Sequence, residues 1–335
     1  MSVFQVGNLS AAPGERKQGY FGGVELMDGS RAALPVILIN GRDDGPTVYF
    51  GAGSHGDEIN GIRAVGEALA QIDPNRLKGR ILAVPVQNPL AYRNRHRLIT
   101  VSQLDQQNMH RVFPGRPDGD VSDRVSHMIM EKLIAATGCD LVLDYHTGST
   151  GSYCPPHSFI AGFGPEETLR KSYAAAIAFD AGILVNAGEG GGIYAMQSML
   201  HMVTTIRGVP TVGCEIGTSL PAEERHIKVG VNGALNVFAH LGMIETPATK
   251  AGPQIVVDQV TNVRTRRGGM VKCLVEPAAK VSRGQCLAQI INVFGEVVDE
   301  VTSPVDGWVI TLVSFGSLNE GERIARIGSR SEKTR

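Results

Sequence analysis

Residues 48–58 read Val48-Tyr49-Phe50-Gly51-Ala52-Gly53-Ser54-His55-Gly56-Asp57-Glu58, an apolar run that enters a turn of small residues. The turn delivers His55 and Glu58 three positions apart, and its glycines allow the backbone to bend sharply enough to aim both side chains at one point. These are two of the three protein ligands of a catalytic zinc site of the two-His, one-Glu type. A His-x-x-Glu pair is a weak signal by itself in a chain with nine His, so its meaning depends on the surrounding sequence.

Around this stretch, residues 33–242 alternate apolar runs with amphipathic segments. We expect strands at 34–39, 47–50, 81–86, 140–143, 182–185 and 211–215, and helices at 59–72, 122–137, 166–180, 194–207 and 222–241. The alternation predicts an α/β fold with a mixed, largely parallel sheet covered by helices on both faces. In such folds, ligand-binding residues collect at the carboxyl ends of the strands.

The pattern changes after Ala251-Gly252-Pro253 to short β-rich runs separated by turn residues. They lie at 255–257, 270–275, 287–291, 297–301, 308–313 and 324–327. We therefore expect a catalytic domain over residues 1–248 and an all-β domain over 253–330. The phrases at 280–285 and 302–309 resemble the barrel-sandwich of biotinyl and lipoyl domains. Those carriers hold a modified Lys where this chain reads Phe294-Gly295-Glu296-Val297, so we interpret the domain as structural.

Composition narrows the class of protein. The formal net charge is -1, with 42% hydrophobic and 19% charged residues, which gives no electrostatic footprint for nucleic acid or an acidic membrane. We find no run of 18 apolar residues, and we expect no signal peptide. The five Cys have an odd count and no Cys-x-x-Cys spacing, as expected for reduced thiols in a cytoplasmic protein. Whether the chain forms homo-oligomers stays open.

A third zinc ligand is expected at another strand end, and Asp140-Leu141-Val142-Leu143-Asp144-Tyr145-His146 fits this requirement. His146 follows an apolar strand, and Asp144 two residues earlier is placed to accept the other ring N–H of a ligand histidine. The alternative is that His146 is a hydrogen-bonded polar residue at the sheet edge. Taken together, the motifs favour one zinc ion held by His55, Glu58 and His146.

A general base is the next requirement, because three protein ligands leave the fourth zinc position to a water whose pKa falls to about 7. Glu215 ends the apolar strand Val212-Gly213-Cys214-Glu215, where an unpaired buried carboxylate is costly. A carboxylate beside the water can take its proton and pass it to a leaving amine. The alternative is a Glu held in a salt bridge at the sheet edge.

Substrate anchoring is expected from the arginine-rich segments 87–97 and 108–115. Arg suits this role because its planar fork binds a carboxylate at two points. For two of the three arginines at 93, 95 and 97 we favour a solvated surface loop.

The order of these motifs resembles the succinylglutamate desuccinylase/aspartoacylase family of zinc carboxypeptidase-like enzymes. It runs His-x-x-Glu, Asn-Pro-x-Ala, Arg-Val-Phe-Pro-Gly, Asp-x-His and Glu-Ile-Gly. The resemblance covers about residues 15–245, and the β-rich tail resembles that of bacterial members, including N-acetyl-diaminobutyrate deacetylases. It implies a zinc carboxypeptidase-like sheet and one Zn²⁺ per chain.

The resemblance also implies roles for individual residues. Glu215 would be the general base and acid, and Arg111 would hold the substrate carboxylate. Arg97, with Arg95 as the rival, would help to polarise the scissile carbonyl. Where the family usually reads Asn-Arg this chain reads His110-Arg111, so His110 and the nearby Asn108 join the expected substrate-binding residues.

The resulting prediction is a zinc-dependent hydrolase that cleaves the amide bond of a small N-acyl amino acid, of the N-acetyl-diaminobutyrate kind. Two alternatives remain. One is a metallocarboxypeptidase acting on peptides, for which the β-rich domain decides access to the cleft. The other is a non-catalytic binding protein that keeps the fold. The expected partner is a small-molecule N-acyl amino acid, with neither nucleic acid nor membrane.

Overall fold

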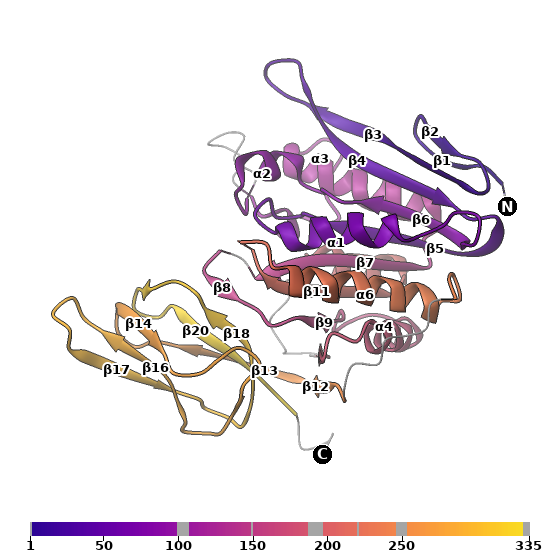
Figure 1. Ribbon diagram of the computed structural model, residues 1–335. Helices are drawn as coiled ribbons and strands as arrows, with labels where there is room; N and C mark the ends of the chain where they lie inside the picture. The colour runs from indigo at the N-terminus through magenta and orange to yellow at the C-terminus, as the bar shows by residue number, and fades with distance from the viewer. Residues whose placement is uncertain are drawn as a thin grey trace.

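A large mixed sheet forms the centre of the molecule (Figure 1). The structure, a computed structural model, describes residues 2–98, 107–148, 150–186, 197–219, 221–245 and 253–330. In these residues the sheet has nine strands, in the spatial order β12 (Ile255–Val257), β10 (Ile183–Val185), β9 (His157–Phe159), β11 (Thr211–Thr218), β7 (Leu141–Gly148), β5 (Asp43–Ala52), β6 (Lys78–Val84), β4 (Arg31–Asn40) and β3 (Glu15–Glu25). The pairs β11–β7, β7–β5 and β5–β6 are parallel, whereas β9–β11 and the edge pairs involving β4 are antiparallel. The predicted mixed, largely parallel sheet is confirmed.

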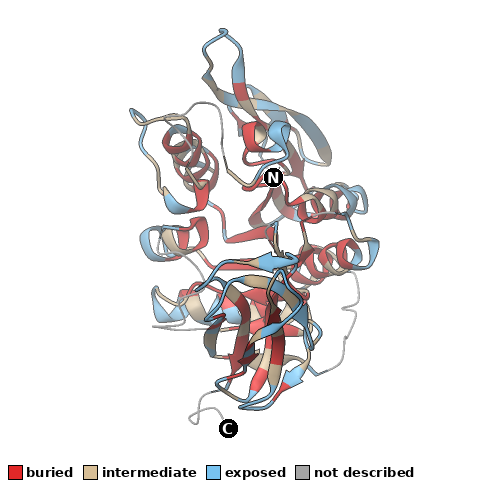
Figure 2. Ribbon diagram, turned by 90° about the vertical axis from the view of Figure 1, so that its left-hand side faces the viewer, coloured by how far each residue is buried: buried red, intermediate tan, exposed pale blue. Residues whose placement is uncertain are grey.

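Helices cover both faces of this sheet. One face carries α1 (Ile59–Ala70), α4 (Glu166–Phe179) and α6 (Glu224–His240). The other carries α3 (Val121–His127) with the π-helix η2 (Met128–Ala135), and α5 (Met199–Met202) with the π-helix η3 (Val203–Arg207). Figure 2 shows the central strands buried and the helices buried mainly on the side that faces the sheet. This is the amphipathic periodicity that predicted them.

The central strands are apolar because both of their faces are covered. Strand β7 is buried along its whole length. The rings of Phe50 on β5 and Tyr145 on β7 meet edge to face, with centroids 4.8 Å apart. Burying a side chain of this size stabilises the fold by about 1.5–3 kcal/mol. This packing holds the carboxyl ends of β5 and β7, and hence the residues that follow them, in one place.

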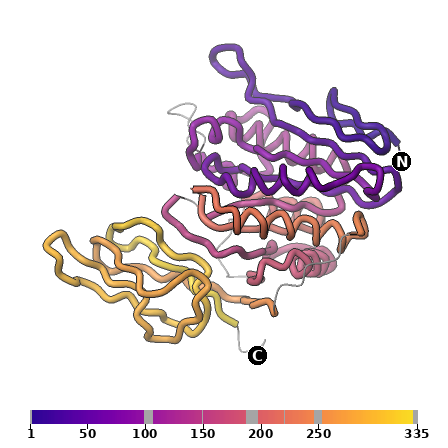
Figure 3. The backbone as a smooth tube through the Cα atoms, in the orientation of Figure 1, coloured from indigo at the N-terminus to yellow at the C-terminus, as the bar shows by residue number. Residues whose placement is uncertain are grey.

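The C-terminal residues 259–330, here called the β module, form two antiparallel sheets. One sheet contains β13 (Gln259–Arg264), β20 (Arg323–Ser329), β18 (Gly307–Val313) and β15 (Lys280–Val281), and the other β17 (Val297–Thr302), β16 (Cys286–Ile291), β14 (Gly269–Cys273) and β19 (Ser317–Leu318). One apolar core lies between them. Strand β8 (Ser152–Tyr153) from the larger part of the chain pairs with β18, so the β module lies against one side of it (Figure 3).

The structure corrects several expected elements. The strand expected at 255–257 as part of the C-terminal domain is β12, which pairs with β10 in the large sheet. The expected helix 122–137 changes from α3 to the wider η2 after His127, and of the expected helix 194–207 residues 194–196 lie outside the described part. Strands β1 (Phe4–Val6), β2 (Leu9–Ala11) and β3 were not predicted, because β3 is an edge strand with largely polar, exposed residues. In the described residues we see no helix both long and apolar enough to cross a membrane.

Candidate active site

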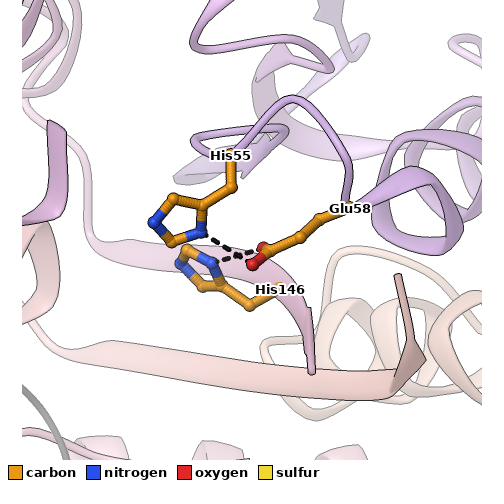
Figure 4. A group of neighbouring side chains, drawn as sticks. All are labelled: His55, Glu58 and His146. Atoms are coloured by element: carbon orange, nitrogen blue, oxygen red, sulfur yellow. Dashed lines mark hydrogen bonds and ion pairs between the residues drawn. The ribbon is translucent and has the colours of Figure 1, made fainter. Parts of the chain in front are cut away.

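Three side chains converge at the carboxyl ends of β5 and β7: His55 and Glu58 come from the turn after β5, and His146 comes from β7 (Figure 4). The Nδ1 atom of His55 lies 2.7 Å from Glu58 Oε1, and the Nδ1 atom of His146 lies 2.8 Å from Glu58 Oε2. All three side chains are buried, and their ligand atoms lie within 4.8 Å of one another. The structure therefore brings together the three residues that the sequence predicted as metal ligands.

The turn that presents His55 and Glu58 depends on glycine. Gly53 has φ +64°, a conformation that favours glycine. A Cβ atom on Gly56 would lie 2.0 Å from the main chain of Ala91, so only glycine fits against α2 (Pro89–Asn94). Glu58 then occupies the N-cap position of α1, and its side chain makes no capping hydrogen bond. The small residues of the motif are thus explained by close backbone packing.

Each candidate ligand histidine has a polar partner on its other ring nitrogen. His146 Nε2 lies 3.0 Å from Asp144 Oδ2, and His55 Nε2 lies 3.0 Å from Asn108 Oδ1. Gln87 Nε2 in turn donates to Asp144 Oδ1 at 2.6 Å. An N–H on each Nε2 leaves the Nδ1 lone pair for a metal, and this is how outer partners orient histidine ligands.

The charges of this cluster are strongly coupled. Burial by itself would raise the pKa of Glu58, but His55 and His146 outweigh burial and hold it well below its usual value. Burial would lower the pKa of His146, yet the carboxylates of Asp144 and Glu58 raise it well above normal. Two buried carboxylates around one imidazole make a site that suits a cation.

His110 lies beside the candidate ligand His146, with the ring centroids 4.4 Å apart. Its Nε2 atom is 3.1 Å from Ser54 Oγ and 3.4 Å from Asp144 Oδ2. Burial and the charge of His146 lower its pKa to about 3, so His110 is neutral at pH 7. His110, Asp144 and His146 also lie close enough to hold a metal. The group with His55 and Glu58 fits better, because a metal on His146 Nε2 would displace the carboxylate that orients this ring.

Glu215 on β11 lies beside His146, its cross-strand neighbour on β7. Burial and the charge of Glu58 raise the pKa of Glu215 to about 8. Its Oε2 atom is buried and has no hydrogen-bond partner in the described part of the chain. A carboxylate near neutral pKa with an unsatisfied oxygen is the combination expected of a general base.

The two candidate arginines of the 93–97 segment differ in position. Arg97 Nη1 donates to Glu58 Oε1 at 2.9 Å. Arg95 is exposed, ends α2 in a left-handed conformation with φ 52°, and does not line the central cavity. The geometry thus favours Arg97 over Arg95 as the arginine near the reacting atoms.

A cavity of about 510 Å³ is lined by two of the candidate ligands, His55 and His146, whereas Glu58 does not line it. Arg97, His110, Arg111 and Glu215 line it, whereas Asn108 does not. Arg111 is exposed at the rim, and its Nη1 atom donates to the carbonyl of His110 at 2.8 Å. Asn108 instead accepts a hydrogen bond from the His110 N–H at 2.9 Å and lies against His55.

Sequence reasoning assigned no role to several residues of this region. Gln87 contacts Asp144, and its place just after the strand expected at 81–86 was a usable signal. Arg264, Arg323 and Arg326 of the β module also line the cavity. No local pattern indicated them, because they are far from the motifs in sequence.

Comparison with known proteins decides the family. Residues 44–241 match the succinylglutamate desuccinylase/aspartoacylase catalytic domain, which is more than half of the chain. The chain belongs to this family. The predicted resemblance is thereby confirmed, and membership makes the chain a hydrolase of the deacylase type.

Individual members of the succinylglutamate desuccinylase/aspartoacylase family align over nearly the whole chain. The N-alpha-acetyl-L-2,4-diaminobutyric acid deacetylase of Halomonas elongata is 26% identical over 300 residues, 88% of this chain and 85% of that protein. Among solved structures, the product-bound ectoine utilization protein EutE (DoeB) from Ruegeria pomeroyi has a TM-score of 0.83 at 24% identity, covering 94% of this chain and 95% of that one. The succinylglutamate desuccinylase/aspartoacylase from Rhodobacter sphaeroides has a TM-score of 0.82 at 23% identity, covering 95% and 96%. Both structures share the fold, including the β module.

Proposed function

We propose that this protein is a zinc-dependent hydrolase that removes the acyl group from a small N-acyl amino acid. The observation that carries the proposal is the convergence of His55, Glu58 and His146 within 4.8 Å of one another, beside the unsatisfied carboxylate of Glu215. The similarity to a deacetylase that acts on an N-acetyl amino acid supports the same reaction class.

The donor set fits zinc. Two imidazole nitrogens and one carboxylate oxygen form the ligand set of catalytic zinc sites, which keep a fourth position for water or substrate. The outer contacts of Asp144 and Asn108 hold the two rings in the tautomer that a metal requires. When bound, zinc would lower the pKa of a water molecule and polarise the scissile carbonyl.

The protein's own groups would divide the remaining work. Glu215 Oε2 would accept the proton of the attacking water and return it to the departing nitrogen, a task helped by its raised pKa. Arg97 would donate hydrogen bonds to the developing oxyanion, and Arg111 at the rim would bind the substrate carboxylate with its planar fork. Asn108 and His110, expected from the sequence to bind substrate, would instead orient His55 and Asp144.

The cavity favours a small substrate over a long peptide. Val313, Phe315 and Leu318 of the β module line one side of it, and the volume of about 510 Å³ suits a molecule of amino-acid size. We propose that residues 1–248 hold the chemistry and that the β module shapes the entrance.

The test is hydrolysis of a panel of N-acetyl, N-succinyl and N-formyl amino acids by zinc-loaded protein. Glu215→Gln should keep about one zinc per chain and lose 10²-fold or more of the activity, because general base catalysis contributes about 10²–10⁴-fold. Glu67→Gln, a change at an exposed side chain paired with Arg63, is the matched control and should leave activity unchanged. A protein that stays metal-free in excess zinc, or full activity in Glu215→Gln, would overturn the proposal.

A further inference from the structure

The side chain of Asn60 connects separate parts of the candidate site. Asn60 is fully buried at the start of α1, two residues after Glu58. Its Nδ2 atom donates to the carbonyl of Ile216 at 2.7 Å and to the carbonyl of Thr218 at 3.1 Å. Its Oδ1 atom accepts from the Glu223 N–H at 3.0 Å. Both N–H groups and the oxygen of the carboxamide are thus engaged.

The main chain bends directly after Glu215. The register of β11 against β7 shifts between Glu215 and Thr218, so the strand is irregular immediately after the candidate base. Gly217 lies inside this irregularity and has φ +80°, a conformation that favours glycine. The two carbonyls that Asn60 binds are those of the residues on either side of Gly217. The carboxamide of Asn60 therefore holds the bend itself.

The start of α6 packs against the same bend. A Cβ atom on Gly217 would lie 2.1 Å from His226 Nδ1, and this nitrogen lies 2.5 Å from Glu223 Oε2. The main-chain N–H of Glu223 is the group that donates to Asn60. Asn60 therefore joins α1, the bend after β11 and the start of α6 in one network of hydrogen bonds.

The helix that carries Asn60 has little room to move. A Cβ atom on Gly61 would lie 3.0 Å from Tyr145 Cβ, and a Cβ atom on Gly230 would lie 2.9 Å from Ala64 Cβ. The first contact holds the start of α1 against β7, and the second holds α1 against α6. Interiors packed this closely resist displacement of one element past another. Asn60 is therefore fixed relative to β7, which carries one of the candidate metal ligands.

The candidate base depends on its backbone for its position. The Oε2 atom of Glu215 is buried and has no hydrogen-bond partner in the described part of the chain, so no such bond to this atom orients the side chain. A general base must come within about 2.6–3.2 Å of the atom whose proton it accepts. The backbone at the end of β11 therefore decides whether this oxygen can reach the attacking water.

We propose that Asn60 is a positioning residue that holds Glu215 in place relative to the candidate metal ligands. The proposal rests on the proposed function and deepens it, because it assigns the alignment of the general base to one residue of α1. Asn60 does not line the cavity, so it acts through the backbone of residues 216–218 and not on the substrate. A misplacement of about 1 Å in an active site can cost about 10²-fold in rate.

Kinetics of zinc-loaded variants test this role. The substrate is the member of the N-acyl amino acid panel that the wild type hydrolyses fastest. Asn60→Ala should keep about one zinc per chain and lower kcat about 10–100-fold with KM within about threefold, because a misaligned base weakens the transition state and not substrate binding. Asn60→Thr keeps one hydroxyl donor for the two carbonyls and should lose less. It carries each of these tests if Asn60→Ala does not fold.

Asn40→Ala is the matched control. Asn40 is equally buried, and its Nδ2 atom donates to the carbonyls of Ser2 at 3.0 Å and Ala11 at 2.9 Å. Its Oδ1 atom accepts from Arg80 Nε at 3.3 Å, and it does not line the cavity. Thermal denaturation should show a similar loss of stability, whereas kcat should stay within about twofold of wild type, because distant sites act independently. An equal loss of kcat in this control would overturn the proposal.

A double-mutant cycle shows whether Asn60 acts through Glu215. The base is already absent in Glu215→Gln, so adding Asn60→Ala should change the residual kcat by less than about twofold, as for residues that act as a unit. A general disturbance of the fold would instead multiply the two losses. Multiplied losses would therefore overturn the positioning role.

Hydrogen exchange separates this proposal from the proposed function. Mass spectrometry follows a peptide that covers residues 213–219, in metal-free and in zinc-loaded protein. This peptide should exchange at least about fivefold faster in Asn60→Ala than in wild type or Asn40→Ala, because exchange reports local opening. Faster exchange with a wild type that hydrolyses no member of the panel would overturn the proposed function and keep the hold of Asn60 on Glu215. An active wild type whose Asn60→Ala variant keeps either kcat or slow exchange would overturn the positioning role and keep the function.

Discussion

Replacing Asp144 by Asn removes one buried negative charge and preserves the hydrogen bonds around it. Asp144 Oδ2 lies 3.0 Å from His146 Nε2, and Asp144 Oδ1 accepts from Gln87 Nε2 at 2.6 Å. The Oε1 atom of Gln87 has no hydrogen-bond partner among the described residues. The amide of Gln87 can therefore turn over and accept from the new Asn N–H. The charge beside the imidazole is then the main difference.

The expected result is a weaker metal site in an intact fold. Burial alone would raise the pKa of Asp144, but His146 and His110 hold it below its usual value, so the carboxylate is ionised at pH 7. Its charge would make the ring of His146 a stronger ligand for the proposed zinc. Loss of such an outer partner typically weakens metal binding 10–100-fold, which corresponds to about 1.4–2.7 kcal/mol.

The assay is competition for zinc with a chromophoric chelator at pH 7.5. Asp140→Asn is the matched control, because Asp140 precedes the same strand at its other end and accepts from the Thr47 N–H at 2.7 Å. It should leave the zinc affinity within about twofold of wild type, since outer-partner effects need contact with the ligand. A change below threefold for Asp144→Asn, or an equal loss in both variants, would refute the reasoning.

Three further predictions concern stability and the turn at the site. In chelator-treated protein, Glu215→Gln should raise the Tm at pH 8 and not at pH 4. The pKa of Glu215 in the folded protein is about 8, above the ordinary value of 4.5, so ionisation of Glu215 opposes folding as the pH rises between these two values. The free energy of unfolding falls by at most about 1.4 kcal/mol per pH unit. An equal Tm shift at both pH values would contradict this prediction. Gly56→Ala should abolish zinc binding, because the added Cβ would clash with α2. Gly66 is exposed on α1 and a Cβ there would meet no other atom, so Gly66→Ala should raise the free energy of unfolding by about 0.5–1 kcal/mol in urea titrations. Tyr145→Phe should lower the free energy of unfolding by about 1–3 kcal/mol, because it leaves a buried α6 carbonyl without its 2.6 Å hydrogen bond; an unchanged urea midpoint would count against this.

Much of the fold follows from short-range patterns. The apolar runs that became β5, β7 and β11 were recognisable because strands covered on both faces must be apolar throughout. Strand β3 escaped prediction because an edge strand can carry exposed polar residues and still pair through its backbone. Strand β12 was assigned to the wrong sheet, since three apolar residues fit either one and only the pairing with β10 decides.

Part of the candidate site also follows from short-range patterns, and part of it does not. His55, Glu58, His146 and Glu215 each follow or end an apolar strand, so their positions predicted that they would meet at one edge of the sheet. The choice of Arg97 over Arg95 could not be made from sequence, because both lie in the same arginine-rich segment. It depends on a turn after α2 that exposes one and brings the other to Glu58.

By itself, the sequence determined the class of fold and the family, and it predicted a set of metal ligands, because periodicity, strand ends and motif order are local properties that residue identity expresses directly. Only the tertiary structure placed Asn108 against His55, placed Gln87 against Asp144 and brought three arginines of the β module to the same cavity. Those contacts join residues 53 and 57 positions apart, and in the β module more than 100 positions separate the arginines of β20 from Glu215. Pairing across such distances depends on how strands and sheets pack together, which no short stretch of sequence encodes.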